Sequence, residues 1–149
     1  MSKENKNRTF IFIDGNDFET HQKLIKTHYF KGMKNIDIFL CATLVGLNVV
    51  GKPSALSNSN KKDYIRVNDN KNKESMIILK SLAISKFNDV NVLSDEEKLF
   101  SFCEGYANSG IKRLYEWYES NEETFENILT KELLNSWNTL DFEKIKEDS

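Results

Sequence analysis

The feature that most constrains the fold is an apolar segment of about 15 residues, IDIFLCATLVGLNVV, at positions 36–50. It carries Asp37 and Asn48 and is too short to cross a bilayer as a helix. A helix over residues 33–47 would be apolar on nearly every side, which is typical of a helix at the centre of a bundle or at a subunit interface. We therefore expect a buried helix here and no membrane span.

The other segments predict more helices and two short strands. Pro53 is the only proline, so little interrupts helix formation. TFIFI at 9–13 has the β-branched and aromatic composition of a strand, and YIRV at 64–67 is a second candidate that could pair with it. The remaining pattern predicts helices over residues 18–30, 33–47, 74–87, 95–108, 111–120 and 122–137.

Local signals predict where these helices begin and end. Asp17 can cap the first helix, and Ser94–Glu97 and Ser120–Glu123 have the spacing of capping boxes. Asn108–Gly110 predicts a helix stop, because glycine readily adopts the left-handed conformation. The expected fold class is mainly α, with five to six helices and one or two short strands. They would form one compact domain over residues 1–149, with flexible ends at 1–8 and 143–149 and a long polar loop at 52–73.

Two observations predict a cytoplasmic protein. Cys41 and Cys103 both lie in apolar stretches, which suits buried free thiols better than a disulfide framework. The N-terminal sequence MSKENKNR has no apolar core of the kind a secretory signal requires.

The charges are divided unevenly along the chain. Residues 52–74 contain six basic and three acidic side chains, whereas residues 115–149 contain ten acidic and three basic ones. Such a division indicates either two different partners or a polar loop followed by solvated helices. If nucleic acid is one partner, the basic stretch supplies its phosphate contacts, with Tyr64 available for stacking. The candidate nucleic-acid-binding residues are Lys52, Lys61, Lys62, Arg66, Lys71 and Lys73.

An alternative hypothesis is a metal-dependent nuclease of the PIN or NYN type. Asp14 follows an apolar strand, as the first metal ligand of such enzymes does, and Asp37 and Asp95 are the candidates for a shared site. However, an Asp-Gly-Asn turn explains Asp14, a capping box explains Asp95, and the middle of the chain lacks a series of buried strands.

The sequence supports few other chemistries. His21 and His28 have no further histidine or cysteine at zinc-ligand spacing, so we expect no metal site. The glycine-rich phosphate-binding motifs and the serine-hydrolase motif are missing as well, so we expect no cofactor.

Two segments resemble a known family. The first is Leu44 to Gly51, and the second combines Glu104, Tyr106, Ala107, Asn108, Gly110 and Leu114. Over about residues 33–118 the chain is similar to Dnd system-associated protein 4, a family of small proteins found beside Dnd-type DNA phosphorothioation systems. The resemblance implies an accessory subunit in bacterial antiphage defence, without a catalytic site.

Our leading hypothesis is therefore a non-enzymatic accessory or adaptor protein. It would contact other defence-system proteins, or a second copy of itself, and DNA contact is a secondary expectation. A third hypothesis is a small DNA-binding regulator. The candidate partner-binding residues are Phe39, Leu44, Tyr106, Asn108, Tyr115, Trp117 and Tyr118.

Overall fold

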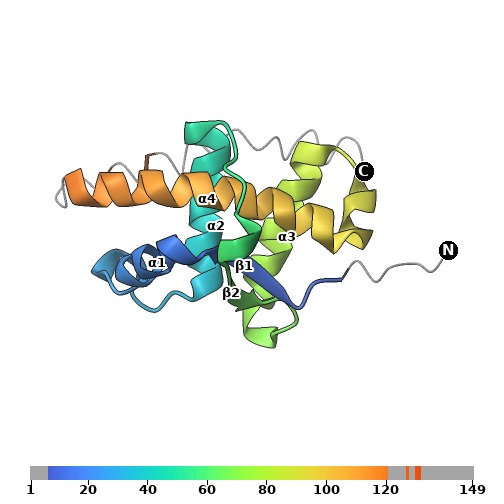
Figure 1. The fold of residues 1–149 in the computed structure, drawn as a ribbon, viewed down its shortest axis with the longest axis horizontal. Helices are drawn as coiled ribbons and strands as arrows, with labels where there is room; N and C mark the ends of the chain where they lie inside the picture. Colours follow the sequence, from blue (N-terminus) through green and yellow to red (C-terminus); the bar gives the residue numbers. More distant parts are fainter. Residues whose placement is uncertain (1–6, 121–126, 128–129, 132–149) are drawn as a thin grey trace.

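The computed structural model describes residues 7–120, 127, 130 and 131 (Figure 1). This part of the chain is mainly helical with one two-stranded sheet, so the expected fold class is confirmed. It contains four α-helices, fewer than the five or six expected. The elements in chain order are β1 (Phe10–Asp14), α1 (Phe18–Ile25), α2 (Asn35–Val45), β2 (Lys61–Arg66), α3 (Lys73–Phe87) and α4 (Glu96–Ser120).

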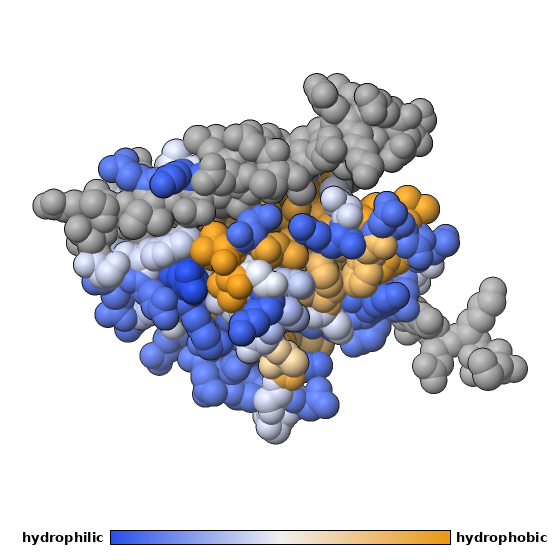
Figure 2. All heavy atoms as spheres, turned by 90° about the horizontal axis from the view of Figure 1, so that it is seen from above, coloured by the Kyte–Doolittle hydropathy of each residue, from blue (hydrophilic) through white to orange (hydrophobic). Residues whose placement is uncertain are grey.

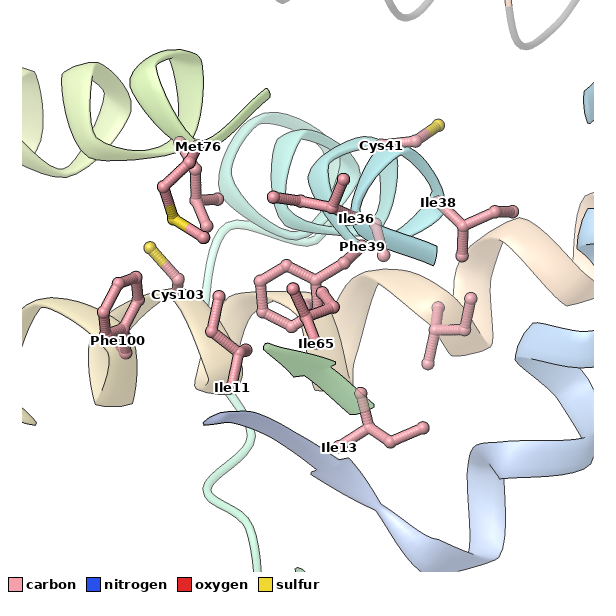
Figure 3. Close-up of a cluster of buried hydrophobic side chains, with 14 of the residues drawn as sticks. Ile11, Ile13, Ile36, Ile38, Phe39, Cys41, Ile65, Met76, Phe100 and Cys103 are labelled. Atoms are coloured by element: carbon pink, nitrogen blue, oxygen red, sulfur yellow. The ribbon is translucent and has the colours of Figure 1, made fainter. Parts of the chain in front are cut away.

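The apolar segment forms α2, which continues into a π-helical turn at Gly46–Val50. Helix α2 contacts α1, α3, α4 and β2, which explains why nearly all of its sides are apolar. Ile36, Ile38 and Phe39 are 0% exposed, and each such side chain contributes about 1.5–3 kcal/mol on burial. Figure 3 shows Phe39 beside side chains from the two strands. The prediction of a buried central helix is confirmed.

Helix α4 crosses closely over the end of α2 because there is a glycine on each side of the contact, Gly110 in α4 and Gly46 directly after α2 (Figure 1). A Cβ atom built on Gly110 would lie 1.7 Å from the carbonyl oxygen of Ala42, and one on Gly46 would lie 1.9 Å from that of Tyr106. Neither distance is possible for a real side chain. The crossing therefore requires glycine at both positions.

The predicted helix stop at Asn108–Gly110 is wrong, because α4 runs without a break from Glu96 to Ser120. Gly110 is used for close packing against α2, and Asn108 bonds another segment instead of ending its own helix. The two helices expected over residues 95–108 and 111–120 therefore form one helix, which accounts for part of the difference in the number of helices. The helix expected over 122–137, with its Ser120–Glu123 capping box, lies largely outside the described residues.

Two predicted helix caps also differ from the structure. At the start of α4 it is Asp95, not Ser94, whose side chain accepts from the backbone, taking the Lys98 N–H at 3.1 Å. Ser94 instead donates its hydroxyl to the carbonyl oxygen of Asn91. Asp17 stands at the start of α1 but makes no capping hydrogen bond, and its carboxylate pairs with Lys112 at 3.1 Å.

The two strands pair antiparallel, with Phe10 opposite Arg66 and Asp14 opposite Lys61. The expected pairing is confirmed, although β2 begins at Lys61, earlier than expected. The segment 52–73 is therefore not one long loop. No helix within the described residues has both the length and the hydropathy that a membrane span requires.

Candidate nucleic-acid interface

The small sheet has one buried and one outward face. Ile11, Ile13 and Ile65 point into the core and are at most 3% exposed. Between them, Phe10 and Phe12 are half-buried on the other face. This alternation is the two-residue period of a strand with one side in water.

Cationic side chains lie over the aromatic rings beside this sheet. The Arg66 guanidinium is 5.2 Å from the ring centre of Phe10, and the Lys61 ammonium is 5.6 Å from that of Phe12. The Lys62 ammonium is 4.4 Å from the ring centre of Phe18, at the start of α1. Such cation–π contacts favour a defined position for long, exposed side chains. Lys61 and Arg66 lie on the outward side of the sheet, whereas Lys62, which is opposite Ile13, lies on the other side and reaches Phe18. We call these residues together the basic face; they are Phe10, Phe12, Phe18, Lys61, Lys62 and Arg66.

A buried ion pair fixes β1 against α4. The guanidinium of Arg8 donates to both carboxylate oxygens of Glu104, each at 2.9 Å, and the two residues are 8% and 3% exposed. Glu104 also accepts the backbone N–H of Phe12 at 2.7 Å. The carboxylate thus has partners for its charge, as a buried ion requires.

Hydrogen bonding also shifts the pKa values in this network. Burial alone would lower the pKa of Arg8, but hydrogen bonds to Glu104 and Glu97 raise it above its ordinary value. The hydrogen bond from Arg8 lowers the pKa of Glu97. Both groups are therefore held in their charged forms.

A pocket of about 440 Å³ adjoins one end of the basic face. Three cationic side chains line it, together with apolar residues of the core. The Lys34 ammonium donates to the carbonyl oxygen of Lys71, which joins the start of α2 to the turn before α3. We call this cavity the nucleotide-sized pocket; its charged lining residues are Lys34, Arg66, Asp69 and Lys71.

The six predicted basic residues are only partly brought together. Lys61, Lys62 and Arg66 lie in β2, and Lys71 lies at the pocket. Lys73 is the exposed first residue of α3. Lys52 lies on a different part of the surface. The segment that follows Lys52 is held against α4, because the Ser54 N–H donates to the Gly105 carbonyl oxygen. Asp63 is also exposed on β2 and reduces the net positive charge.

The carboxylates of the nuclease hypothesis lie on three separate elements and have structural hydrogen bonds. Asp14 accepts from Asn16 and Asn60 at the end of β1. Asp37 accepts from Ser75 and from the backbone of Lys34, and Asp95 caps α4. Among residues 7–120, no three histidine, cysteine or acidic side chains are grouped as a metal site would require. The structure does not bring these aspartates together.

The candidate partner-binding residues are divided between the interior and the surface. Phe39 is 0% exposed and Asn108 is 6% exposed, because Phe39 packs in the core and Asn108 donates to the carbonyl oxygen of Ser54 at 2.9 Å. Both are occupied by contacts within the chain, so we do not include them in a partner surface. The other five are half-buried: Leu44, Tyr106, Tyr115, Trp117 and Tyr118.

Several titratable side chains are buried or half-buried in the structure. His21 is 1% exposed, and burial, assisted by the Lys112 charge, lowers its pKa to about 3. Its ring centre is 4.9 Å from that of Tyr64, whose pKa is raised by burial. Cys41 and Cys103 are buried free thiols, as predicted. Burial raises the pKa of Cys41 to about 12, and it also raises that of Cys103.

Sequence reasoning missed the phenylalanines of the basic face and Lys34. The alternation in TFIFI contained the signal for Phe10 and Phe12, since a strand with isoleucines inside must place them outside. Lys34 carried no comparable signal, because the pocket is formed from segments far apart in the sequence.

The comparison with known families agrees with the resemblance seen in the sequence. The model of the family described as DNA sulphur modification system-associated protein 4 matches residues 18–146. No curated protein and no solved structure matches the chain. Because the family model spans most of the chain, including α1 to α4 and β2, this protein belongs to the DNA sulphur modification system-associated protein 4 family.

Proposed function

We propose that this protein is a non-catalytic accessory subunit of a DNA sulphur modification system, acting in the cytoplasm in antiphage defence, and that its basic face contacts the DNA backbone. The observation that carries the proposal is that β2 has three exposed cations, each lying over a phenylalanine ring. Cations contact phosphates without reading sequence, and nearby aromatic rings can stack on bases.

The dimensions of β2 are consistent with this role. Lys61 and Arg66 stand at the two ends of the strand, and five residue steps of about 3.3 Å separate them by roughly 16 Å. One strand of DNA has a phosphate about every 3.4 Å along the axis, so the row is long enough to accompany roughly five nucleotides.

DNA binding can be measured by fluorescence anisotropy with labelled single-stranded and duplex oligonucleotides at several salt concentrations. We expect Lys61→Gln/Lys62→Gln to weaken binding at least about fivefold and to reduce the slope of log affinity against log salt by about one per lysine. Lys86→Gln/Lys98→Gln removes the same charge from α3 and α4 and should bind like the unaltered protein. Equal weakening in both variants would contradict a defined basic face, as would the absence of salt-dependent binding by the unaltered protein.

A second surface favours contact with another protein of the system. Ile77 and Ile78 on α3 are 58% and 40% exposed, and Val90 and Leu93 in the following turn are 66% and 42% exposed. Figure 2 shows hydrophobic residues on the outer surface on the side where α3 lies. Exposed apolar groups of this kind are typical of interaction sites. Co-purification with the products of neighbouring genes should decrease for Ile77→Lys and remain for Lys86→Gln; unchanged co-purification for Ile77→Lys would contradict this role.

A further inference from the structure

The nucleotide-sized pocket is lined by two kinds of side chain, cationic and apolar, which together match the two parts of a nucleotide. We propose that it binds one unstacked nucleotide of a DNA strand, with the phosphate beside its cations and the base against its apolar side. The inference rests on the proposed function, because the strand that enters the pocket is the one the basic face would hold.

The cationic side is formed by Lys34, Arg66 and Lys71. One carboxylate, Asp69, lies among them, and its oxygen is 3.6 Å from the Lys71 ammonium. The lining thus has more positive than negative charge. Arg66 is held over Phe10, and a guanidinium stacked on a ring still has N–H groups at its edge that can donate to phosphate oxygens. This side therefore suits an anion with several acceptor oxygens.

The pocket is also lined by apolar side chains, several of which belong to the core or pack against it. Met33 is 47% exposed, and Phe10, Ile25 and Tyr64 are half-buried, so these four side chains present the apolar surface of the pocket. A bare phosphate gains nothing from such a surface, whereas a planar base can pack against it.

Polar groups at the pocket could orient the base. Asn35 and Asn72 also line it. The Asn72 amide donates to the Arg66 carbonyl oxygen at 3.1 Å, whereas the half-buried Asn35 has an amide that can both donate to and accept from the edge of a base. The volume of about 440 Å³ falls within the usual range of small-molecule sites, about 300–1,000 Å³. A base can enter only after leaving its stack, so the ligand is single-stranded DNA or a strand end.

The proposal can be tested by NMR titration of the ¹⁵N-labelled full chain with deoxynucleoside 5′-monophosphates, the matching deoxynucleosides and inorganic phosphate. We expect a monophosphate to shift the side-chain amides of Asn35 and Asn72 in a saturable manner, at concentrations at least about tenfold lower than either fragment. Equal saturation by inorganic phosphate would mean an anion site only and would overturn the nucleotide proposal. Absence of a saturable shift at these residues would overturn it as well.

Two variants give the matched comparison. Lys34→Gln should weaken monophosphate binding at least about fivefold, whereas Lys31→Gln, an exposed lysine three positions earlier that does not line the pocket, should leave it unchanged. Equal weakening of monophosphate binding in Lys34→Gln and Lys31→Gln would overturn the proposal.

The variant Lys61→Gln/Lys62→Gln separates this inference from the proposed function. It should reduce oligonucleotide binding and leave monophosphate binding unchanged. Oligonucleotide binding without monophosphate binding would overturn the pocket alone. Monophosphate binding without oligonucleotide binding would overturn the role of the basic face.

Discussion

The close crossing of α2 and α4 makes Gly110→Ala the sharpest test of the fold. The added methyl carbon would lie 1.7 Å from the Ala42 carbonyl oxygen and 2.7 Å from the Gly46 nitrogen. Both atoms belong to the backbone, so no side-chain rotation can relieve the contact. The two helices would have to move apart, which would also loosen the core packed between them.

The expected magnitude follows from two opposing effects. Replacing a helical glycine by alanine favours the helix by up to about 1 kcal/mol. Overpacking costs about 1–3 kcal/mol, and a backbone clash of this size belongs at or above the upper end. We therefore expect the free energy of unfolding to fall by at least about 2 kcal/mol, which corresponds to a decrease in Tm of roughly 4–8 °C.

Gly105→Ala is the matched control within the same helix. Its methyl carbon would lie 3.0 Å from the Pro53 Cβ and 3.9 Å from the Ser54 oxygen, contacts that a small shift of the connecting segment can relieve. The free energy of unfolding of Gly105→Ala should remain within about 1 kcal/mol of that of the unaltered protein, because the gain in helix propensity offsets the crowding. Urea unfolding monitored by circular dichroism measures the free energy of unfolding of both variants. If Gly110→Ala is as stable as Gly105→Ala, the helices do not cross at Gly110 and the packing described for α2 and α4 is wrong.

Three further predictions concern buried groups. Arg8→Met should lower the free energy of unfolding by about 3–5 kcal/mol, because Glu104 is left buried without its arginine. In urea unfolding, Arg8→Met/Glu104→Met should lower the free energy of unfolding by less than the sum of the two single changes. Additive losses would contradict the ion pair. The pKa of His21 is about 3 in the fold and 6.5 in the unfolded chain, so the unfolded state binds the proton first and stability falls as pH drops below 6.5. From pH 7 to pH 5 the loss due to His21 should be about 2 kcal/mol, and His21→Phe should lack it in urea unfolding at the two pH values. Cys41 and Cys103 should not react with a thiol reagent at pH 8 until the chain is unfolded, and fast labelling of the native protein would show that one of them is accessible.

The parts of the fold that could be predicted are those governed by local composition. The segment 36–50 is apolar throughout, so a buried helix is its most favourable state whatever its neighbours are. The β-branched and aromatic composition of TFIFI likewise predicted a strand, and the second β-rich segment was its available partner.

The parts that could not be predicted depend on contacts between distant residues. Asn108–Gly110 has a local signal for a helix end, but the contact of Gly110 with α2 uses the glycine for a different purpose. The Arg8–Glu104 pair joins residues 96 positions apart, and nothing in either neighbourhood of the sequence indicates the other. The nucleotide-sized pocket combines residues from β1, α1, the start of α2, β2 and the turn before α3, so its cations were visible in the sequence but their arrangement was not.

The family match begins at residue 18, just after β1, yet the physical role of β1 shows that residues 7–17 belong to the same folding unit. Without β1, the inner edge of β2 would have no hydrogen-bonding partner, and burial of Ile11 and Ile13 would be lost. Glu104 would remain buried without the Arg8 guanidinium. An uncompensated buried charge of this kind strongly destabilises the fold. Phe10 and Phe12, over which Arg66 and Lys61 lie, would also be missing. A chain that began at residue 18 would therefore lose stability and the basic face together, so any measurement of DNA binding requires the N-terminal strand.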